Sequence, residues 1–493
     1  MYESGAIYKS LITTDTKTYL SMVGIAKEFI EKAQERIGDF KRLQKAGLIN
    51  LQGQFFPSVH YPPITMYPPI EQKVLFEGYK NPTGDLFDIY VHIPFCIRYC
   101  AFCHYPVKIG ASPEEKDVYL RMLEKEMRIY MRTLGVKKLR ARSILIGGGT
   151  PTYISAAQLE NFLASFVSYV DLSCCSQFSY DVDPTTLTDP DGPARIKIMR
   201  AHGVDRLTIG IQSFDEDILK VMNRAHNKDE ALRAIRASQE AGFKVNIEFI
   251  YGYYNQTLKE WIDTLRQAVD TGVDEIQLYR LKIIPYGDHE GTVLKKFFRN
   301  PIDFPATELP LAMKSIAISY LSQQGYHENL RRVFSRTPQD FSRYADNQCC
   351  GLLDEAGFGL TAFSSLHDRF ALNTMDLQKY YALIDKGRLP VDRGLVRDKN
   401  NQMRWAIILP LKNRRVHKKY YQQLTGISLD EIFREKIENL KRYGLLYEDD
   451  KILELTDLGS FFADEVCHQF HHPSHMPFTQ SAYSEGDLNP YNS

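Results

Sequence analysis

Three cysteines stand close together in a segment that reads YVHIPFCIRYCAFC. Cys96, Cys100 and Cys103 follow the spacing C-x3-C-x2-C. Three thiolates on one loop could bind three irons of a 4Fe–4S cluster and leave the fourth iron open to a small chelating ligand. A structural zinc ion would need a fourth protein ligand, and the adjacent His104 would have to bend back to supply it. The spacing therefore favours an iron–sulfur cluster, with zinc or unliganded thiols as the alternatives.

Three consecutive glycines, Gly147 to Gly149, follow the next strand-like run and precede Thr150. Glycine adopts backbone conformations that are closed to other residues and lets a ligand approach the backbone closely. Free N–H groups at the start of the following helix could hold an anion or an amino-acid head group. A triple glycine is often only a tight turn between a strand and a helix. Its place one β-α unit after the cysteines favours a ligand site.

Polar residues stand where several other buried strands are expected to end. Asp181 and Asp183 follow one strand, Gln212 follows another and Glu248 a third, while Arg224 lies in the segment MNRAH. A polar group at the end of a buried strand needs a partner, so each side chain is expected to face a ligand or another site residue. A capped turn or a structural salt bridge is the alternative for each residue alone. The whole set on a single rim favours a site.

Short strands and helices alternate strictly from residue 86 onward, which explains how one rim could collect these residues. Strand-like runs are expected at residues 88–93, 143–149, 178–183, 206–212, 244–252 and 274–281. Amphipathic helical patterns separate them, and Gly242 is expected to cap one of these helices. The repeat predicts an α/β fold in which a parallel sheet with right-handed crossovers curls into a full or partial barrel. Ligands of such barrels bind at the carboxyl ends of the strands.

Four regions are predicted along the chain. They are an N-terminal extension (1–85), the barrel (86–330), a connecting region that completes the site (331–400), and a winged-helix-like α+β domain with a polar tail (401–493). The extension combines a helix at about 18–46 with a proline-rich tract, whose five prolines between positions 57 and 69 exclude a helix. This tract is either a linker that wraps the next domain or a strap that closes over a pocket.

The composition excludes several functional classes. The chain has 493 residues, of which 44% are hydrophobic and 25% charged, as in a globular protein of two or three domains. Lys+Arg and Asp+Glu both number 61, so neither nucleic acid nor an anionic membrane is an expected partner. The sequence has no run of 18 apolar residues and no signal pattern. We therefore expect a cytoplasmic protein without a membrane span.

The motifs together resemble a known family. In chain order they are Y-x-H-I-P-F-C-x3-C-x-F-C, GGGTPT, VDP, IGIQSF, NRAH, IYG and GFGLTA. From about residue 88 to 470 the sequence is similar to the radical S-adenosylmethionine (SAM) family of oxygen-independent coproporphyrinogen III dehydrogenase. The resemblance implies a partial barrel of six β/α units, a 4Fe–4S cluster and two SAM molecules. It also implies reductive cleavage of the first SAM to a 5′-deoxyadenosyl radical that abstracts hydrogen.

The resemblance further implies roles for individual positions. The cluster ligands match Cys96, Cys100 and Cys103; the first SAM site matches Tyr90, Gly148, Asp181 and Phe363; the second SAM site matches Phe102, Gly149, Thr150, Gln212, Arg224, Glu248 and Lys282. We predict Tyr90 and Phe102 to be catalytic. Asp181 and Glu248 exchange one acidic residue for the other relative to the family and keep the carboxylate. Lys282 replaces a small residue, which could change the shape or charge of the second SAM site.

One departure from the family pattern concerns the reaction. The porphyrinogen dehydrogenase has a fourth cysteine two residues after the third, where this sequence has Tyr105. Because the second SAM positions are retained, we predict that the second SAM donates one carbon. The reaction would be C-methylation or cyclopropanation of an sp2 carbon in a small-molecule substrate, such as an aromatic compound, a quinone or a natural product.

Three alternatives to one-carbon transfer stay open. The first is oxidative decarboxylation of coproporphyrinogen III, for which Arg98, Lys108 and Arg280 are available near the site to bind propionates. The second is anaerobic opening of a heme or porphyrin ring. The third is a heme chaperone, with His92 and His226 as candidate axial ligands.

Two expectations remain. Reductive cleavage of SAM consumes an electron, so we expect a reducing partner such as flavodoxin or ferredoxin. Near the C-terminus, five residues have spacings that could bind a metal at a helix end: Cys467, His468, His471, His472 and His475. A surface histidine run or a lid over the pocket is the alternative for that segment.

Overall fold

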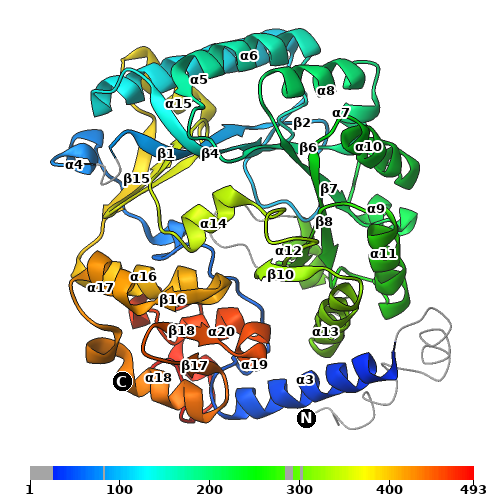
Figure 1. The fold of residues 1–493 in the computed structure, drawn as a ribbon, viewed down its shortest axis with the longest axis vertical. Coiled ribbons are helices and arrows are strands. Elements are labelled where there is room, and N and C mark those ends of the chain that lie inside the picture. Colours follow the sequence, from blue (N-terminus) through cyan, green and yellow to red (C-terminus); the bar gives the residue numbers. More distant parts are fainter. Residues whose placement is uncertain (1–25, 81–83, 284–291, 300–303, 493) are drawn as a thin grey trace.

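A 13-stranded sheet forms the centre of the molecule (Figure 1), in a computed structural model that describes residues 26–80, 84–283, 292–299 and 304–492. Its strand order is β10-β11-β9-β8-β7-β6-β4-β1-β12-β13-β14-β15, and β5 pairs with β4. The bounds of these strands are β1 Leu86–Ile93, β4 Leu139–Gly148, β5 Val170–Asp171, β6 Phe178–Val182, β7 Arg206–Gln212, β8 Lys244–Tyr251, β9 Glu275–Arg280, β10 His327–Leu330, β11 Val333–Ser335, β12 Glu355–Phe358, β13 Phe363–Leu366, β14 Arg369–Asn373 and β15 Val391–Val396.

Six of these strands carry the predicted barrel. β1, β4, β6, β7, β8 and β9 are parallel neighbours in that order. Each is joined to the next through at least one helix, and these helices lie on the outside of the curved sheet (Figure 1). The predicted α/β fold with a partial barrel is confirmed.

The helices begin where the sequence supplies capping residues. The side chains of Ser112 and Glu115 form reciprocal hydrogen bonds with the backbone at the start of α5, and Asn227 and Glu230 do the same at α10. Such a pair satisfies two N–H groups that a helix leaves open. The helices around the barrel are α5 Pro113–Leu134, α6 Ala156–Tyr169, α7 Pro184–Thr188, α8 Gly192–Ala201, α9 Glu216–Val221, α10 Lys228–Glu240, α11 Leu258–Asp270, α12 Thr292–Arg299 and α13 Glu308–Gln323. Gly242 follows α10 with a φ of 80°, as its predicted capping position requires.

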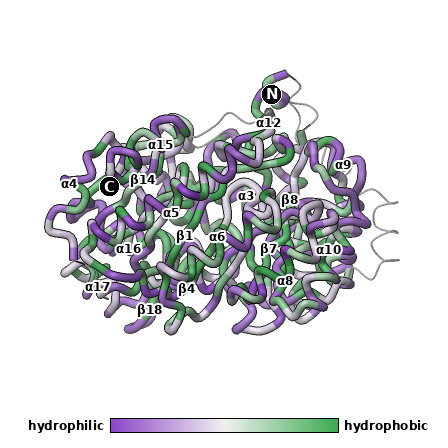
Figure 2. Tube along the Cα trace, turned by 90° about the horizontal axis from the view of Figure 1, so that it is seen from above, coloured by the Kyte–Doolittle hydropathy of each residue, from purple (hydrophilic) through white to green (hydrophobic). Residues whose placement is uncertain are grey.

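The core lies between the sheet and these helices. Hydrophobic residues follow the strands through the interior, and hydrophilic residues predominate on the outer helices (Figure 2). Parallel strands are covered on both faces, so their residues are almost continuously buried. In β1, for example, every residue except Leu86 and Tyr90 is buried, and these two are partly buried. The interior also holds an ion pair between Arg206 and Glu275. Among the described residues, no helix is both long and apolar enough to cross a membrane.

The connecting region is more ordered than its sequence indicates. Residues 331–400 supply β11 to β15 and the helices α14 Arg343–Cys349 and α15 Leu377–Asp385. β12 extends the barrel sheet beside β1 in parallel, whereas β13, β14 and β15 continue it in antiparallel pairs. This extension brings Phe363, at the start of β13, to the sheet beside Tyr90.

The N-terminal extension packs against the far end of the chain. Helix α3 spans Lys27–Lys45 and packs against α13, and residues 18–25 of the predicted helix lie outside the described residues. After α3 the proline-rich tract runs in extended form, interrupted by the short helices η1 Ile64–Met66 and α4 Gln72–Phe76. The Gly394 N–H donates to the carbonyl of Pro68 (3.0 Å) at the edge of β15. We call residues 55–63 of this tract the strap.

The C-terminal region forms a smaller α+β unit. Its elements are α16 Lys399–Asn413, β16 Arg415–His417, α17 Lys418–Thr425, α18 Leu429–Arg442, β17 Leu446–Glu448, β18 Ile452–Leu455, α19 Asp457–Phe461 and α20 Ala463–His468. The three strands pair in the order β16-β18-β17. The tail that follows contains the 3-10 turns η3 Pro473–His475 and η4 Gln480–Ala482 and returns to α3, where the N–H of Leu488 donates to the carbonyl of Ala46 (2.9 Å).

Candidate active site

The cysteine loop leaves the carboxyl end of β1 through the two-residue strand β2 (Phe95–Cys96), which pairs with β3 (Lys108–Ile109). All three cysteines are partly buried and none forms a disulfide. The Thr150 hydroxyl donates to the Cys96 Sγ (3.7 Å), and Arg224 Nη1 donates to the Cys100 Sγ (3.3 Å). Two of the three sulfurs therefore already face donors, one from the glycine turn after β4 and one from the loop between α9 and α10.

Thiol chemistry supports a cluster at this loop. Burial raises the pKa of Cys96 to about 12 and that of Cys103 to about 11. These thiols stay protonated at neutral pH unless a metal cation binds them, and a coordinating thiol is deprotonated outright. A 4Fe–4S cluster takes each thiolate on a different iron, so the three sulfurs need not meet at one point. The donor set and its surroundings fit such a cluster.

The glycine turn lies directly against the cysteine loop. The Gly149 N–H donates to the carbonyl of Ile93 (2.9 Å), and the Thr150 N–H donates to that of Phe95 (2.7 Å). A Cβ at position 149 would lie 2.7 Å from the Phe95 oxygen and 2.8 Å from the Cys96 Sγ. Gly148 has a φ of +117°, which side chains rarely allow. The glycines are therefore required by a close approach of two loops. The N–H groups of Gly149 and Thr150 are bonded to the cysteine loop, so they are not the free donors that the sequence analysis expects.

Three of the four residues predicted for the first SAM form one wall of the site. The Tyr90 and Phe363 rings stack, with centroids 5.8 Å apart. The Asp181 carboxylate lies against Gly147, where an added Cβ would be 2.5 Å from Oδ2. Burial, followed by the Glu248 carboxylate, raises the pKa of Asp181 to about 8. A carboxyl with a pKa close to neutral pH can accept a hydrogen bond from a ligand hydroxyl when it is charged and donate one to that hydroxyl when it is protonated.

Residues predicted for the second SAM gather around Arg224. Its Nη2 donates to the Asp183 carboxylate (2.7 Å) and to the Gly210 carbonyl (2.6 Å). Gln212 has a φ of 71°, an uncommon backbone conformation for a residue with a side chain. The buried Gln212 Oε1 has no hydrogen-bond partner within the described residues. Such a strained residue with an open acceptor is frequent at ligand sites.

The remaining second-site positions are less close together. Glu248 accepts a hydrogen bond from the Tyr279 hydroxyl (3.3 Å) inside the barrel. Phe102 packs against an apolar cluster that includes Met222 and Val293. The backbone carbonyl of Lys282 is 3.0 Å from His104 Nε2, the residue after the third cysteine. Lys282 is thus tied to the cysteine loop through its backbone.

The strap supplies a site residue that the sequence patterns do not reveal. The His60 ring lies edge-on against Phe363, with centroids 4.5 Å apart. Burial lowers the pKa of His60 to about 3, so its ring is neutral. Behind it, the Ser58 N–H donates to Asp464 (2.9 Å) and Lys412 donates to the Ser58 carbonyl (2.6 Å). A proline-rich tract has no periodicity that could indicate where it docks.

The cations considered for propionates point in different directions. Lys108 pairs with Glu115 (3.3 Å), and the exposed Arg98 donates to the Arg224 carbonyl (3.4 Å). Tyr279 faces Glu248 inside the barrel. Because successive strand residues point to opposite faces, the next residue of β9, Arg280, lies on the face away from the barrel interior. The expectation that Arg280 serves the barrel site is therefore wrong.

The histidines of the sequence analysis are engaged in the fold. His92 contacts the Tyr90 hydroxyl through Nδ1 (2.9 Å), and the His226 Nε2 lies 3.2 Å from the Ile211 carbonyl. Near the C-terminus, His471 lies 3.2 Å from the Ser58 hydroxyl. Among the described residues, no three His, Cys, Asp or Glu side chains are arranged as for a single metal ion. The C-terminal cluster thus packs against the strap.

Comparisons with known proteins agree with this architecture. Residues 90–268 match the model of the radical SAM superfamily, and residues 398–462 match that of the HemN C-terminal domain. The chain is 26% identical to a heme chaperone HemW of Bacillus subtilis over 389 residues, which cover 77% of this chain and 98% of that protein. It is 25% identical to an oxygen-independent coproporphyrinogen III oxidase of Escherichia coli over 413 residues, covering 80% and 88%.

The solved structures include one with the same fold over most of the chain. It is coproporphyrinogen III oxidase (HemN) from Escherichia coli, with a TM-score of 0.71 and 24% identity, covering 82% of this chain and 96% of that one. That structure shows the same fold, and the match of residues 90–268 to the radical SAM model shows that the protein is a radical SAM enzyme. Within that superfamily, the chain belongs to the oxygen-independent coproporphyrinogen III dehydrogenase-like family. Membership implies a 4Fe–4S cluster and SAM.

Proposed function

We propose that this radical SAM enzyme oxidises a carboxylated tetrapyrrole of the coproporphyrinogen type. The observation that carries the proposal is the similarity to oxygen-independent coproporphyrinogen III oxidases along about four-fifths of the chain. This similarity favours oxidation of coproporphyrinogen III, which the sequence analysis gives as an alternative, over one-carbon transfer.

Each group of site residues has a role in this proposal. Cys96, Cys100 and Cys103 hold the cluster. When bound, the cluster and SAM would supply radical chemistry able to remove a hydrogen atom from the substrate. Thr150 and Arg224 donate to two of the sulfurs and so stabilise their negative charge. Tyr90, Phe363 and His60 form a largely apolar wall that shields the reacting centre from water.

A second candidate is C-methylation or cyclopropanation with a second SAM as one-carbon donor. Two observations favour it. Tyr105 takes the place of the fourth cysteine, and its side chain is 61% exposed, so it replaces that thiol with a solvated ring. Gln212 and Arg224 also present polar groups on the rim where the second SAM is expected.

The heme chaperone alternative is less favoured by the site. It would use His92 and His226 as axial ligands, and both side chains are buried, with exposed fractions of 1% and 4%. Burial lowers the pKa of each to about 4, so both are neutral, but each has a nitrogen next to a protein group. The Nε2 of His92 has no hydrogen-bond partner within the described residues, but it is buried, so an iron porphyrin would have to displace the groups that cover it.

One anaerobic experiment separates these functions. The reconstituted protein is reduced and incubated with SAM that carries a deuterated methyl group, in parallel with coproporphyrinogen III and with a simple aromatic acceptor. The products to measure are 5′-deoxyadenosine, carbon dioxide and deuterated product. A variant in which Cys96, Cys100 and Cys103 are all alanine serves as the control without a cluster. In the cell we propose flavodoxin or ferredoxin as the electron donor.

The outcomes differ clearly. The main proposal predicts 5′-deoxyadenosine together with carbon dioxide from coproporphyrinogen III. If deuterium is transferred to the aromatic acceptor and no carbon dioxide forms from coproporphyrinogen III, the main proposal is wrong and one-carbon transfer takes its place. Tight heme binding with no 5′-deoxyadenosine would point to a carrier and contradict both enzymatic proposals.

A further inference from the structure

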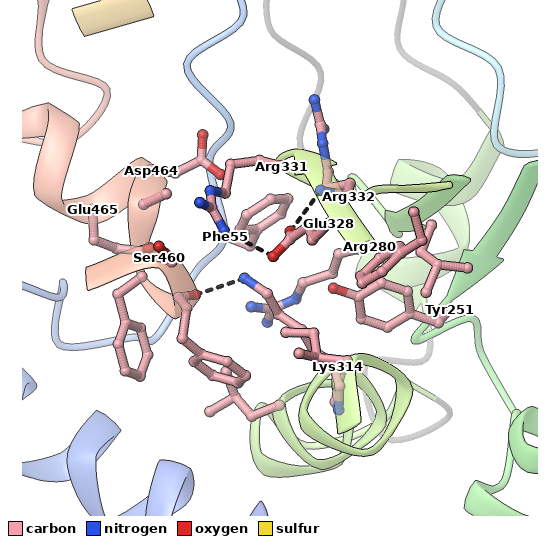
Figure 3. A pocket seen from close by; sticks show the side chains of 18 residues that line it. Phe55, Tyr251, Arg280, Lys314, Glu328, Arg331, Arg332, Ser460, Asp464 and Glu465 are labelled. Atoms are coloured by element: carbon pink, nitrogen blue, oxygen red, sulfur yellow. Dashed lines mark hydrogen bonds and ion pairs between the residues drawn. The ribbon is translucent and has the colours of Figure 1, made fainter. Parts of the chain in front are cut away.

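A pocket lies where three parts of the chain meet, outside the barrel. It is bounded by the ends of β8 and β9, by α13 and β10, by α19 and α20, and by Phe55 of the strap (Figure 3). Its cavity volume is about 50 Å³, and the pocket is partly open to solvent. We call it the junction pocket. None of the residues predicted to bind the cluster or SAM lines this pocket.

Two cationic side chains extend into the junction pocket (Figure 3). Arg280 comes from the end of β9 and Lys314 from α13. Within the described residues, neither side chain forms an ion pair with a carboxylate, and Lys314 donates to the carbonyl of Phe461 (2.6 Å). Burial lowers the pKa of both side chains, which reports that their charge is poorly solvated.

The other charges around the junction pocket have contacts of their own, although the buried Nε atoms of Arg331 and Arg332 have no hydrogen-bond partner within the described residues. Arg331 pairs with Glu328 (2.8 Å), and Asp464 pairs with Lys412 (2.8 Å) behind the wall. The Arg332 guanidinium lies over the Tyr279 ring, 5.2 Å from its centroid. These contacts leave the pocket's own polar interior to Arg280 and Lys314.

One further carboxyl group, that of Glu465, lines the pocket and interacts electrostatically with both cations without forming an ion pair with either within the described residues. Burial, followed by repulsion from Asp464, raises the pKa of Glu465. A shift in this direction favours the protonated form of the carboxyl, which can donate a hydrogen bond to an anion. A buried positive charge without a partner is unfavourable by several kcal/mol, so an anion that reaches Arg280 would gain what the fold leaves unsatisfied.

Aromatic rings shape the rest of the junction pocket. The Arg280 guanidinium lies over Phe55, 5.0 Å from the ring centroid, and the Lys314 ammonium lies over Phe461 at 4.7 Å. Tyr251 and Phe462 add further apolar surface. A bare inorganic ion would leave these rings without a partner, whereas a ligand with an apolar body would cover them.

The junction pocket is separate from the barrel interior. Along β9 the side chain of Tyr279 faces Glu248 in the barrel, whereas Arg280 faces the junction. The sheet itself therefore stands between the two sites. The connection between them is the strap, which has Phe55 at the junction pocket and His60 against Phe363.

We propose that the junction pocket binds a small organic carboxylate with an apolar body, with Arg280 and Lys314 holding the carboxylate and the aromatic rings holding the body. The source is either a free metabolite or a carboxylate side chain of a larger molecule, since both present the same group. The site is distinct from the radical site and does not depend on the reaction that the protein catalyses.

The test is calorimetric titration of the full chain after anaerobic cluster reconstitution, without SAM. The probe is 3-phenylpropionate, and the comparison ligands are 3-phenylpropan-1-ol, which has no charge, and inorganic phosphate, which has no apolar body. The variants are Arg280→Gln and Lys314→Gln. Arg266→Gln removes a positive charge from the exposed side of α11 and is the matched control.

The proposal predicts that 3-phenylpropionate binds at about one site per chain and that both comparison ligands bind roughly tenfold more weakly or not at all. Arg280→Gln and Lys314→Gln should each weaken binding by a similar factor, and Arg266→Gln should not. Arg280→Lys keeps the charge without the planar fork and should fall between wild type and Arg280→Gln, provided that thermal unfolding is unchanged.

Three results would overturn the proposal. They are no binding of 3-phenylpropionate, equal binding to wild type and Arg280→Gln, and tighter binding of phosphate than of the carboxylate. If coproporphyrin III competes with the probe, the carboxylate belongs to a tetrapyrrole propionate. If it does not compete, the carboxylate belongs to a free metabolite. Failure of the radical reaction would leave these binding results unaffected.

Discussion

Replacing Gly149 by alanine should disrupt the cluster site through one added methyl group. The new Cβ would lie 2.7 Å from the Phe95 oxygen and 2.8 Å from the Cys96 Sγ. Carbon makes favourable contacts at about 3.5–4.0 Å, so the two loops must separate by about half an ångström or more. Much of the obstacle is backbone, which cannot rotate away. Overpacking of this kind costs about 1–3 kcal/mol of folding free energy.

The same displacement should affect metal binding more than folding. Metal–ligand distances in working sites hold to within about 0.2 Å, and the shift required at Cys96 exceeds that. We therefore expect Gly149→Ala to fold but to retain less than about half of the iron and sulfide that the wild type binds after anaerobic reconstitution. Chemical analysis of both elements and the thiolate-to-iron absorption band measure this.

Gly38→Ala is the matched control for the glycine substitution. Gly38 lies in α3, and an added Cβ would meet nothing within 4 Å. Alanine there should keep the full iron content and stabilise the helix by about 0.5–1 kcal/mol. If Gly149→Ala bound as much iron as Gly38→Ala, the close approach of the glycine turn to the cysteine loop would not be a constraint, and the reasoning would fail.

Three further predictions follow from the site. His60→Ala should weaken SAM binding severalfold in equilibrium dialysis, because Phe363 loses its neighbour, whereas His60→Phe should restore it; an unchanged affinity in His60→Ala would exclude the strap from the site. Arg224→Met leaves Asp183 buried without its cation and should lower stability to urea by about 3–5 kcal/mol, with partial recovery in Arg224→Lys; equal stability of all three proteins would refute the pair. The third concerns pH: burial raises the folded-state pKa of Asp181 from its ordinary value of 3.8 to about 8. The folded chain therefore binds a proton that the unfolded chain releases, and stability falls as pH rises from about 4 to about 8. Urea unfolding without SAM should show a shallower fall in Asp181→Asn than in wild type, and parallel curves would contradict the assignment.

The barrel was predictable because its signals are local. Parallel strands covered on both faces produce apolar runs such as that of β8, and the helices between them carry their own capping residues. The cysteine loop, the glycine turn and the polar strand ends follow these runs at fixed places. Their position on one rim then follows from the topology.

Features that depend on tertiary docking were not predictable. The strands of residues 331–400 are three to six residues long, and, apart from the parallel pair of β12 with β1, they pair in antiparallel fashion with segments that no local pattern identifies. The direction of Arg280 depends on the alternation along β9, and a shift of one residue would have turned it into the barrel. His60 reaches the site only because Ser58 is held by Lys412 and Asp464, more than 350 positions away in the sequence.

The strap also sets the order in which the protein can be completed during synthesis. Ser58 binds Asp464 across 406 positions, and Gly47 lies against Asn489. At about 5–20 residues per second, a ribosome needs about 20–80 s between these partners. Over that interval α3 and the strap have no finished C-terminal surface to bind, although the barrel strands between them can pair. His60 therefore reaches Phe363 late, and the wall that shields the radical site closes only once the last domain has emerged.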